Sequence, residues 1–134
     1  MNPSALILQT SNQCVLVVDD NPDNLILLQY LLEELGFQTC IADCGRAALA
    51  MVESQPPDLI LLDLMMPDLS GIEVARSIRG NPFIRDIPIV LVTAYTEEIE
   101  DEDYRLLNGI LSKPIDETKL SLLLKSMINN AAVD

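Results

Sequence analysis

Two kinds of apolar segment alternate along this chain of 134 residues. The first kind is short and continuous, which is typical of strands buried on both faces of a parallel sheet. Five such segments are predicted to be strands: 14–18, 37–42, 59–62, 89–92 and 109–111. The second kind is longer and carries apolar residues three or four positions apart, the spacing of an amphipathic helix.

Residues that start or stop helices mark the bounds of these longer segments. Pro22 suits the first turn of the first helix, and Gly36 is placed to end it. Ser70 is a plausible cap of the third helix, and Asp116 opens the fifth. The segment 96–107 is predicted to be the fourth helix, with its acidic residues in the first turns, where the helix dipole favours negative charge. A strand–helix order repeated five times predicts one open α/β sheet with helices on both faces.

Composition narrows the classes of function. Lys and Arg number 8 against 21 Asp and Glu, so the net charge is −13. This charge opposes binding to nucleic acid and to anionic membranes. Histidine is absent, so the chain itself cannot be a histidine kinase or a histidine phosphotransfer protein. Three cysteines, an odd number without metal-site spacing, indicate reduced thiols and a cytoplasmic protein.

Polar residues that could act together in one site follow four of the predicted strands. Asp19 and Asp20 follow the first, Asp63 ends the third, Thr93 follows the fourth and Lys113 follows the fifth. The carboxyl ends of parallel strands share one edge of the sheet, so we expect these side chains to converge. Each residue alone also fits an ordinary turn, cap or strand position. Together, however, the carboxylates favour Mg²⁺ (or Mn²⁺), and the hydroxyl and ammonium groups suit phosphoryl oxygens.

Four stretches in order resemble the receiver domains of two-component response regulators. They are 15–21 (VLVVDDN), 61–71 (LLDLMMPDLSG), 88–94 (PIVLVTA) and 111–114 (LSKP). The resemblance covers about residues 14–130 and implies a flavodoxin-like, doubly wound (βα)5 fold with strand order 2-1-3-4-5. Residues 1–13 and 131–134 are expected to be tails outside this receiver domain.

The resemblance implies a role for each matching residue. Asp63 accepts a phosphoryl group, and Asp19 and Asp20 hold the metal together with Asp63 and the backbone carbonyl of Met65. Thr93 and Lys113 contact the phosphoryl group. The resemblance also implies a cis peptide bond before Pro114. The phosphoryl donor would be a sensor histidine kinase or a histidine phosphotransfer protein, and the readout surface about residues 96–130.

The chain departs from the family at one switch position. Ile110 stands where many receivers carry an aromatic residue, so the usual inward swing of a ring cannot operate. Met65 and Tyr95 occupy two variable positions near the acceptor, and their bulk is expected to shield a phosphoryl group from water. Met65 and Tyr95 therefore predict a comparatively long-lived phosphorylated state. This state is expected to signal through protein–protein binding, because the 134 residues leave no room for a separate output domain.

Three other functions fit the sequence less well than a phosphorylated receiver does. A pseudo-receiver that binds proteins without phosphorylation is the main alternative, although such chains usually lose one of the acidic residues or the lysine. An aspartyl-phosphate phosphatase needs a second aspartate two residues after the nucleophile, where this chain has Met65. Only self-phosphorylation and autodephosphorylation are therefore expected, and not enzymatic turnover. A flavin carrier needs a phosphate-binding loop after the first strand, where this chain is acidic.

The sequence also supports expectations about the extent of the chain, its oligomeric state and its acidic surface. The Met1 start and the short end after the fifth helix predict a complete single-domain protein. The protein is expected to be a monomer or a weak dimer. The acidic run between residues 97 and 103 is either a solvated surface or an electrostatic label that selects a basic partner.

Overall fold

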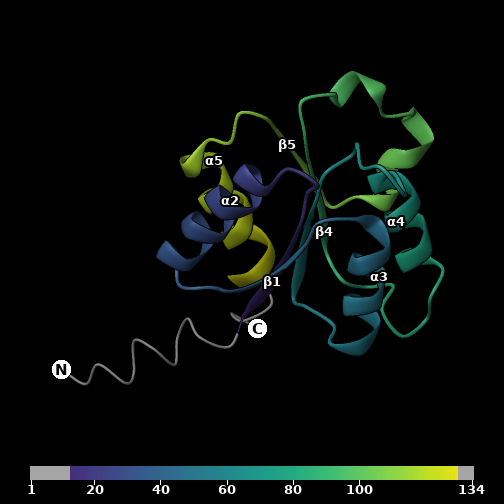
Figure 1. The fold of residues 1–134 in the computed structure, drawn as a ribbon, viewed down its shortest axis with the longest axis horizontal. Helices are drawn as coiled ribbons and strands as arrows, with labels where there is room; N and C mark the ends of the chain where they lie inside the picture. Colours follow the sequence, from purple (N-terminus) through teal and green to yellow (C-terminus); the bar gives the residue numbers. More distant parts are fainter. Residues whose placement is uncertain (1–12, 130–134) are drawn as a thin grey trace.

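A five-stranded sheet forms the centre of the computed structural model, which describes residues 13–129 (Figure 1). All neighbouring strands pair in parallel, in the order β2-β1-β3-β4-β5. The strands are β1 (Cys14–Val18), β2 (Gln38–Ala42), β3 (Leu59–Leu62), β4 (Ile89–Thr93) and β5 (Gly109–Ser112). The predicted strands, strand order and doubly wound α/β class are therefore confirmed.

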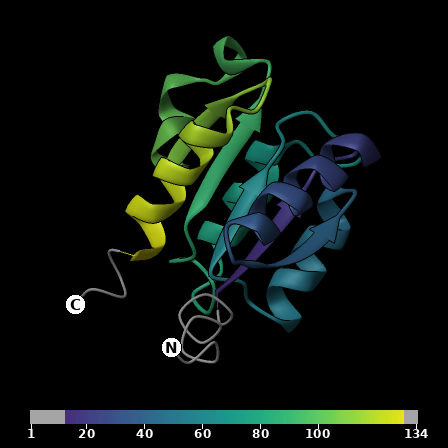
Figure 2. The ribbon, with the colours of Figure 1, turned by 90° about the vertical axis from the view of Figure 1, so that its left-hand side faces the viewer.

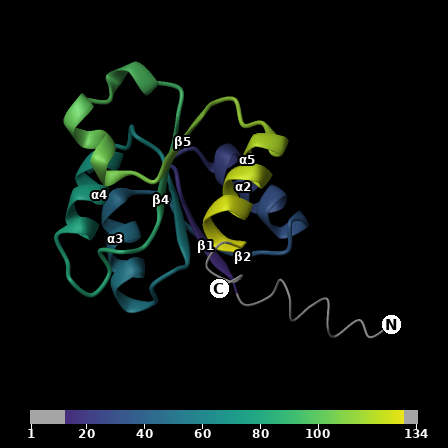
Figure 3. The ribbon, with the colours of Figure 1, turned by 180° about the vertical axis from the view of Figure 1, so that it is seen from behind.

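Within residues 13–129, four α-helices cover the two faces of the sheet. They are α2 (Pro22–Glu34), α3 (Gly45–Ser54), α4 (Gly71–Arg79) and α5 (Glu117–Leu124), and α5 continues as a π-helical turn, η3 (Lys125–Asn129). Figures 1 and 3 show α2 and α5 on one face and α3 and α4 on the other. Figure 2 shows α2 and α5 lying in front of the sheet.

The helix ends follow the sequence signals. Pro22 is the first residue of α2, and Gly36, just beyond the helix, has a φ of 95°, which glycine adopts without steric cost. Ser70 and Glu73 form a reciprocal capping box at the start of α4. Asp116 accepts hydrogen bonds from two backbone N–H groups of the first turn of α5. These caps fix where each helix leaves the functional edge of the sheet.

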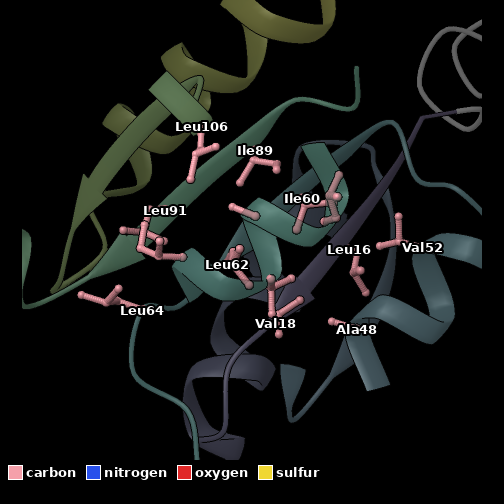
Figure 4. Packing of buried hydrophobic residues seen from close by; sticks show 14 of the residues in the cluster. Leu16, Val18, Ala48, Val52, Ile60, Leu62, Leu64, Ile89, Leu91 and Leu106 are labelled. Carbon is pink, nitrogen blue, oxygen red and sulfur yellow. The ribbon is translucent and has the colours of Figure 1, made fainter. Parts of the chain in front are cut away.

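Two apolar clusters hold the layers together, one on each face of the sheet. Leu16, Ile60 and Leu62 lie in the cluster beneath α3 and α4, which Figure 4 shows from close by. Val17 and Leu61 lie in the cluster beneath α2 and α5. The alternation arises because successive side chains of a strand point to opposite faces. Every residue of β3 is buried, as the continuous apolar run predicts.

The predicted α-helix over residues 96–107 is wrong. This segment instead forms two 3₁₀ turns, η1 (Thr96–Glu98) and η2 (Asp101–Leu106), separated by extended backbone at Ile99 and Glu100. An α-helix would place like charges four positions apart, as between Glu97 and Asp101 and between Glu98 and Glu102, and such pairs destabilise helices. Ile99 and Leu106 are buried and anchor the segment in the core beside α4.

Two further observations concern the extent of the chain. The predicted tails 1–13 and 131–134 lie, apart from residue 13, outside the described residues. Among residues 13–129, no helix has the length and apolar character needed to cross a membrane.

Candidate functional site

The carboxyl edge of the sheet brings three of the predicted carboxylates together. Asp19 and Asp20 follow β1, and Asp63 follows β3. One carboxylate oxygen from each of the three lies within 4.8 Å of the other two. Thr93 ends β4 at the same edge, and Lys113 follows β5 and reaches the carboxylates.

Asp19 is the most heavily bonded of the three carboxylates. The side chain is 2% exposed, and its Oδ2 accepts a hydrogen bond from Lys113 Nζ at 2.8 Å. Asn21 N donates to Oδ1 at 2.9 Å, and Asn24 Nδ2 donates to Oδ2 at 3.3 Å. These contacts hold the carboxylate in one orientation.

The surroundings of Asp63 disfavour its negative charge. Burial raises the pKa of its carboxyl group, and the nearby charge of Asp19 raises it further. Lys113 Nζ, 3.4 Å from Asp63 Oδ2, and the N–H of Leu64, which donates to Oδ1 at 2.8 Å, act in the opposite direction. Ionised Asp63 is therefore a buried carboxylate that its protein surroundings only partly compensate.

Lys113 is shared between two carboxylates. Burial opposes its positive charge, but the hydrogen bond to Asp19 and the charges of Asp63 and Asp19 outweigh this effect and raise the pKa of the ammonium group. Lys113 N also donates to the carbonyl of Thr93 at 3.0 Å, and the Lys113–Pro114 peptide bond is cis. The hydrogen bond to Thr93 holds the backbone that carries the lysine beside the end of β4.

The hydroxyl of Thr93 lies at a fully buried position. Its Oγ1 accepts a hydrogen bond from Tyr95 N at 3.1 Å, which leaves the hydroxyl proton free to be donated elsewhere. Tyr95 and Met65 are both about half exposed, at 50% and 54%. Ile110 of β5 is partly buried and packs against the apolar cluster beneath α3 and α4.

The loop between β3 and α4 is held close to Asp63 by a glycine. A Cβ on Gly71 would lie 2.3 Å from the backbone oxygen of Asp63, so only glycine fits there without displacement. Gly71 N also donates to Leu64 O at 2.8 Å. The start of α4 is thus bonded to Leu64 and lies against the backbone of Asp63, which carries the buried carboxylate.

Sequence reasoning missed two residues around this site. Asn24, on the first turn of α2, donates to Asp19, and Asp68, in the β3–α4 loop, accepts from the first turn of α3. The position of Asn24, five residues after Asp19 at a helix start, could have suggested the first contact. No sequence signal indicates the second contact, because it joins segments more than twenty residues apart.

The donor set fits a hard divalent cation. Three carboxylates gathered within 4.8 Å repel one another, and only one lysine compensates them among the described side chains. Oxygen ligands of this kind suit Mg²⁺, which usually binds one or two carboxylates and keeps several waters. Such a cation would reduce the repulsion that raises the pKa of Asp63.

Comparisons with known proteins agree with this geometry. The family model described as "Response regulator receiver domain" matches residues 15–125. The polar-differentiation response regulator DivK of Brucella ovis is 33% identical over 119 residues, which cover 87% of this chain and 97% of the relative.

Solved structures give the same result. The response regulator TrrA of Thermotoga maritima, solved in complex with Mg²⁺-BeF, has a TM-score of 0.81 and 34% identity, covering 87% of this chain and 99% of that one. The receiver domain of the sensor histidine kinase PA1611 of Pseudomonas aeruginosa has a magnesium ion coordinated in the active site cleft. It has a TM-score of 0.80 and 31% identity, with coverage of 87% and 98%. With the fold, the acidic edge and these relatives in agreement, the chain belongs to the receiver domain family of response regulators and is a module of two-component signalling.

Proposed function

We propose that Asp63 accepts a phosphoryl group from a phosphohistidine in a Mg²⁺-dependent reaction and that the phosphorylated chain signals through altered protein–protein binding. The observation that carries the proposal is the placement of Asp63. It is a buried carboxylate within 4.8 Å of two others and 3.4 Å from a lysine. A carboxylate in this setting can act as the nucleophile of phosphoryl transfer.

The transfer needs Asp63 in its ionised form. A carboxylate oxygen attacks phosphorus, the bond from phosphorus to the imidazole nitrogen of the donor breaks, and its electron pair stays on that nitrogen. These 134 residues contain no histidine, so the donor imidazole lies outside them. Lys113 favours the ionised form of Asp63, because its charge acts against the effect of burial.

Asp19, Asp20, Asp63 and the backbone carbonyl of Met65 are the residues proposed to hold Mg²⁺. When bound, the ion supplies positive charge that neutralises the phosphoryl oxygens. The protein contributes orientation, because Asp19 is held by three donors before any ligand arrives. Asp20 is exposed, so it can turn toward a cation at little cost.

Two side chains are placed to hold the phosphoryl group after transfer. Lys113 bonds Asp19 and lies near Asp63, so its ammonium group can shift toward phosphoryl oxygens without leaving the site. The buried hydroxyl of Thr93 can donate its proton in the same direction. We propose that this donation draws Thr93 and the following backbone inward.

The proposed readout surface comprises residues 96–130, as far as 129 within the described structure. In this chain it begins with the acidic 3₁₀ turns η1 and η2 rather than an α-helix. Ile110 stands in place of the aromatic switch residue. A conformational change that links Asp63 to this surface would therefore alter how Ile110 of β5 packs against the apolar cluster beneath α3 and α4. The partner that reads this surface is a protein, since the net charge of −13 opposes nucleic acid.

Intact-mass measurement tests the proposal directly. The wild type, incubated with acetyl phosphate and Mg²⁺, should gain one phosphoryl group, and the gain should disappear in Asp63→Asn and in EDTA. A histidine phosphotransfer protein carrying phosphohistidine should phosphorylate the same residue. If neither donor gives a gain, and beryllofluoride also fails to bind, the pseudo-receiver interpretation replaces this one.

A further inference from the structure

We propose that Asp68 is a positioning residue for the metal site, because its carboxylate ties the β3–α4 loop to the first turn of α3 and so fixes the backbone of Met65. The inference rests on the proposed function, since Met65 supplies one of the proposed metal ligands. Asp68 itself does not belong to that ligand set. It lies five residues after the acceptor and acts through the loop.

The carboxylate of Asp68 is engaged on both oxygens. Gly45 N and Leu69 N donate to Oδ1 at 2.9 and 2.8 Å, and Arg46 N donates to Oδ2 at 2.8 Å. Two of these donors belong to α3 and the third to the loop itself. The backbone hydrogen bonds from Arg46 and Gly45 lower the pKa of this carboxyl group to about 2, so it is ionised at neutral pH.

The start of α3 depends on this contact. The first N–H groups of an α-helix have no partner within the helix. The residue that would normally cap α3 is Cys44, whose sulfur accepts only from Ala47 N at 3.5 Å. Sulfur is a weak acceptor, so a carboxylate from another element supplies the main cap and the favourable charge at the positive end of the helix.

Close packing reinforces the hydrogen bonds. A Cβ on Gly45 would lie 2.8 Å from Leu69 Cβ and 3.0 Å from Val74 Cγ2, so the loop and α4 press directly on the backbone of α3. Substitution at Gly45 would therefore force these elements apart. The loop contacts α3 through both van der Waals packing and the carboxylate of Asp68.

Among the described residues, the other hydrogen bonds of loop residues 64–70 join the loop only to its own strand and helix. Leu64 is tied to Asp63 and Gly71, and Ser70 is tied to α4 by the capping box. Between these anchors the chain crosses an open hollow that Asp20, Met65 and Asp68 line together. The carboxylate of Asp68 bonds this part of the loop to α3. Removing the carboxylate should therefore loosen the backbone at Met65.

The test measures Mg²⁺ affinity by isothermal titration calorimetry in wild type, Asp68→Ala, Asp68→Asn and Asp58→Ala. Asp58 is a matched control, because it also accepts a backbone N–H from another element, Cys14 N at 2.7 Å, and lies at the opposite end of the strands. Asp68→Ala should weaken Mg²⁺ binding about tenfold, the lower end of the range for groups that orient metal ligands. Asp58→Ala should leave the affinity unchanged.

Asp68→Asn separates the clamp from the loss of charge, because the amide keeps an oxygen that can accept from Gly45 and Leu69. Its NH2 group cannot accept from Arg46 N, so that hydrogen bond is lost. A clamp therefore predicts that this variant recovers part of the affinity, and that the defect of Asp68→Ala persists in about 1 M KCl, where the Debye length is about 3 Å. The amides of Gly45 and Arg46 should exchange faster with solvent in Asp68→Ala.

Three results would overturn the inference. They are an unchanged Mg²⁺ affinity in a folded Asp68→Ala variant, an equal loss in Asp58→Ala, and a loss that is the same in Asp68→Asn and disappears in high salt. Failure of the wild type to bind Mg²⁺ at all would instead refute the proposed function on which the inference rests.

Discussion

Replacing Asp63 by asparagine should raise the free energy of unfolding in metal-free buffer while it abolishes phosphoryl acceptance. The substitution keeps the shape of the side chain, and an amide oxygen can still accept from Leu64 N, as Oδ1 does now at 2.8 Å. It removes one negative charge from a site that holds three carboxylates and one lysine. The ionised carboxylate of Asp63 is thus expected to destabilise the folded protein.

Distances in the site give the size of the effect. At an effective dielectric constant of about 20, Lys113 at 3.4 Å attracts the charge of Asp63 by about 5 kcal/mol. Asp19, at no more than 4.8 Å, repels it by at least about 3.5 kcal/mol, and the exposed Asp20 adds about half of that after solvent screening. Attraction and repulsion nearly cancel, so the cost of burial remains. Burying the polar amide of asparagine also has a cost, which is smaller than that of a charge. We therefore expect Asp63→Asn to raise the free energy of unfolding by about 1–2 kcal/mol.

The pH dependence has a definite sign. A carboxyl pKa raised by burial means that the folded protein holds this proton more tightly than the unfolded chain does. The wild type should therefore lose stability as pH rises from the ordinary value of 3.8 through the folded pKa, and Asp63→Asn should not show this loss. The two proteins should differ least at low pH and most above the folded pKa.

Urea unfolding followed by circular dichroism, in EDTA and across this pH range, measures the difference. Mg²⁺ at about 100 times its Kd should then stabilise the wild type by about 2.7 kcal/mol, and the variant less. Asp58→Asn, a carboxylate at the other end of the sheet, is the control. The reasoning fails if Asp63→Asn is less stable than the wild type at pH 7 without metal.

Three further predictions concern the site and the opposite edge of the sheet. Gly71→Ala, whose Cβ would lie 2.3 Å from the Asp63 carbonyl, should cost about 3 kcal/mol by urea unfolding, and a loss below 0.5 kcal/mol would contradict the packing argument. Met65→Ala and Tyr95→Ala should each shorten the half-life of the phosphorylated state, measured by intact mass after donor removal, and unchanged half-lives in both would exclude shielding. Arg79→Lys should cost about 2 kcal/mol in unfolding free energy, because the guanidinium donates to three backbone carbonyls and one amide oxygen that a lysine cannot serve together; equal stability would refute this.

The sheet could be predicted because its determinants are local. Segments such as 59–62 are continuous apolar runs, and only a strand buried on both faces accommodates them between helical segments. The approach of Asp19, Asp20 and Asp63 follows from strand ends alone, since parallel strands end at one edge. Residue placement at that edge therefore needs no knowledge of side-chain contacts.

The fourth helix could not be predicted from the same signals. Buried Ile99 and Leu106 lie seven positions apart, as on one helix face, and acidic residues at a helix start are usually favourable. That benefit extends only over the first turn, whereas the run continues through Asp103. Repulsion along the helix then exceeds it, and two 3₁₀ turns retain the buried anchors without aligning the charges.

Apart from the local bond between Asn24 and Asp19, the contacts that sequence reasoning missed join a side chain to the backbone of a distant segment. Asp68 bonds α3 more than twenty residues away, and Arg79 bonds the carbonyls of Ile87 and Leu106. Neither partner has a sequence signature, because every residue carries the same backbone groups. Strand ends place the three carboxylates, Thr93 and Lys113 at one edge of the sheet. Asp68 holds the loop that follows Asp63, whereas Arg79 holds the segments that precede β4 and β5, at the opposite edge of the sheet. The position of the loop beside Asp63 should therefore depend on a single side chain more than the approach of the carboxylates does, and Asp68 is where that dependence can be measured.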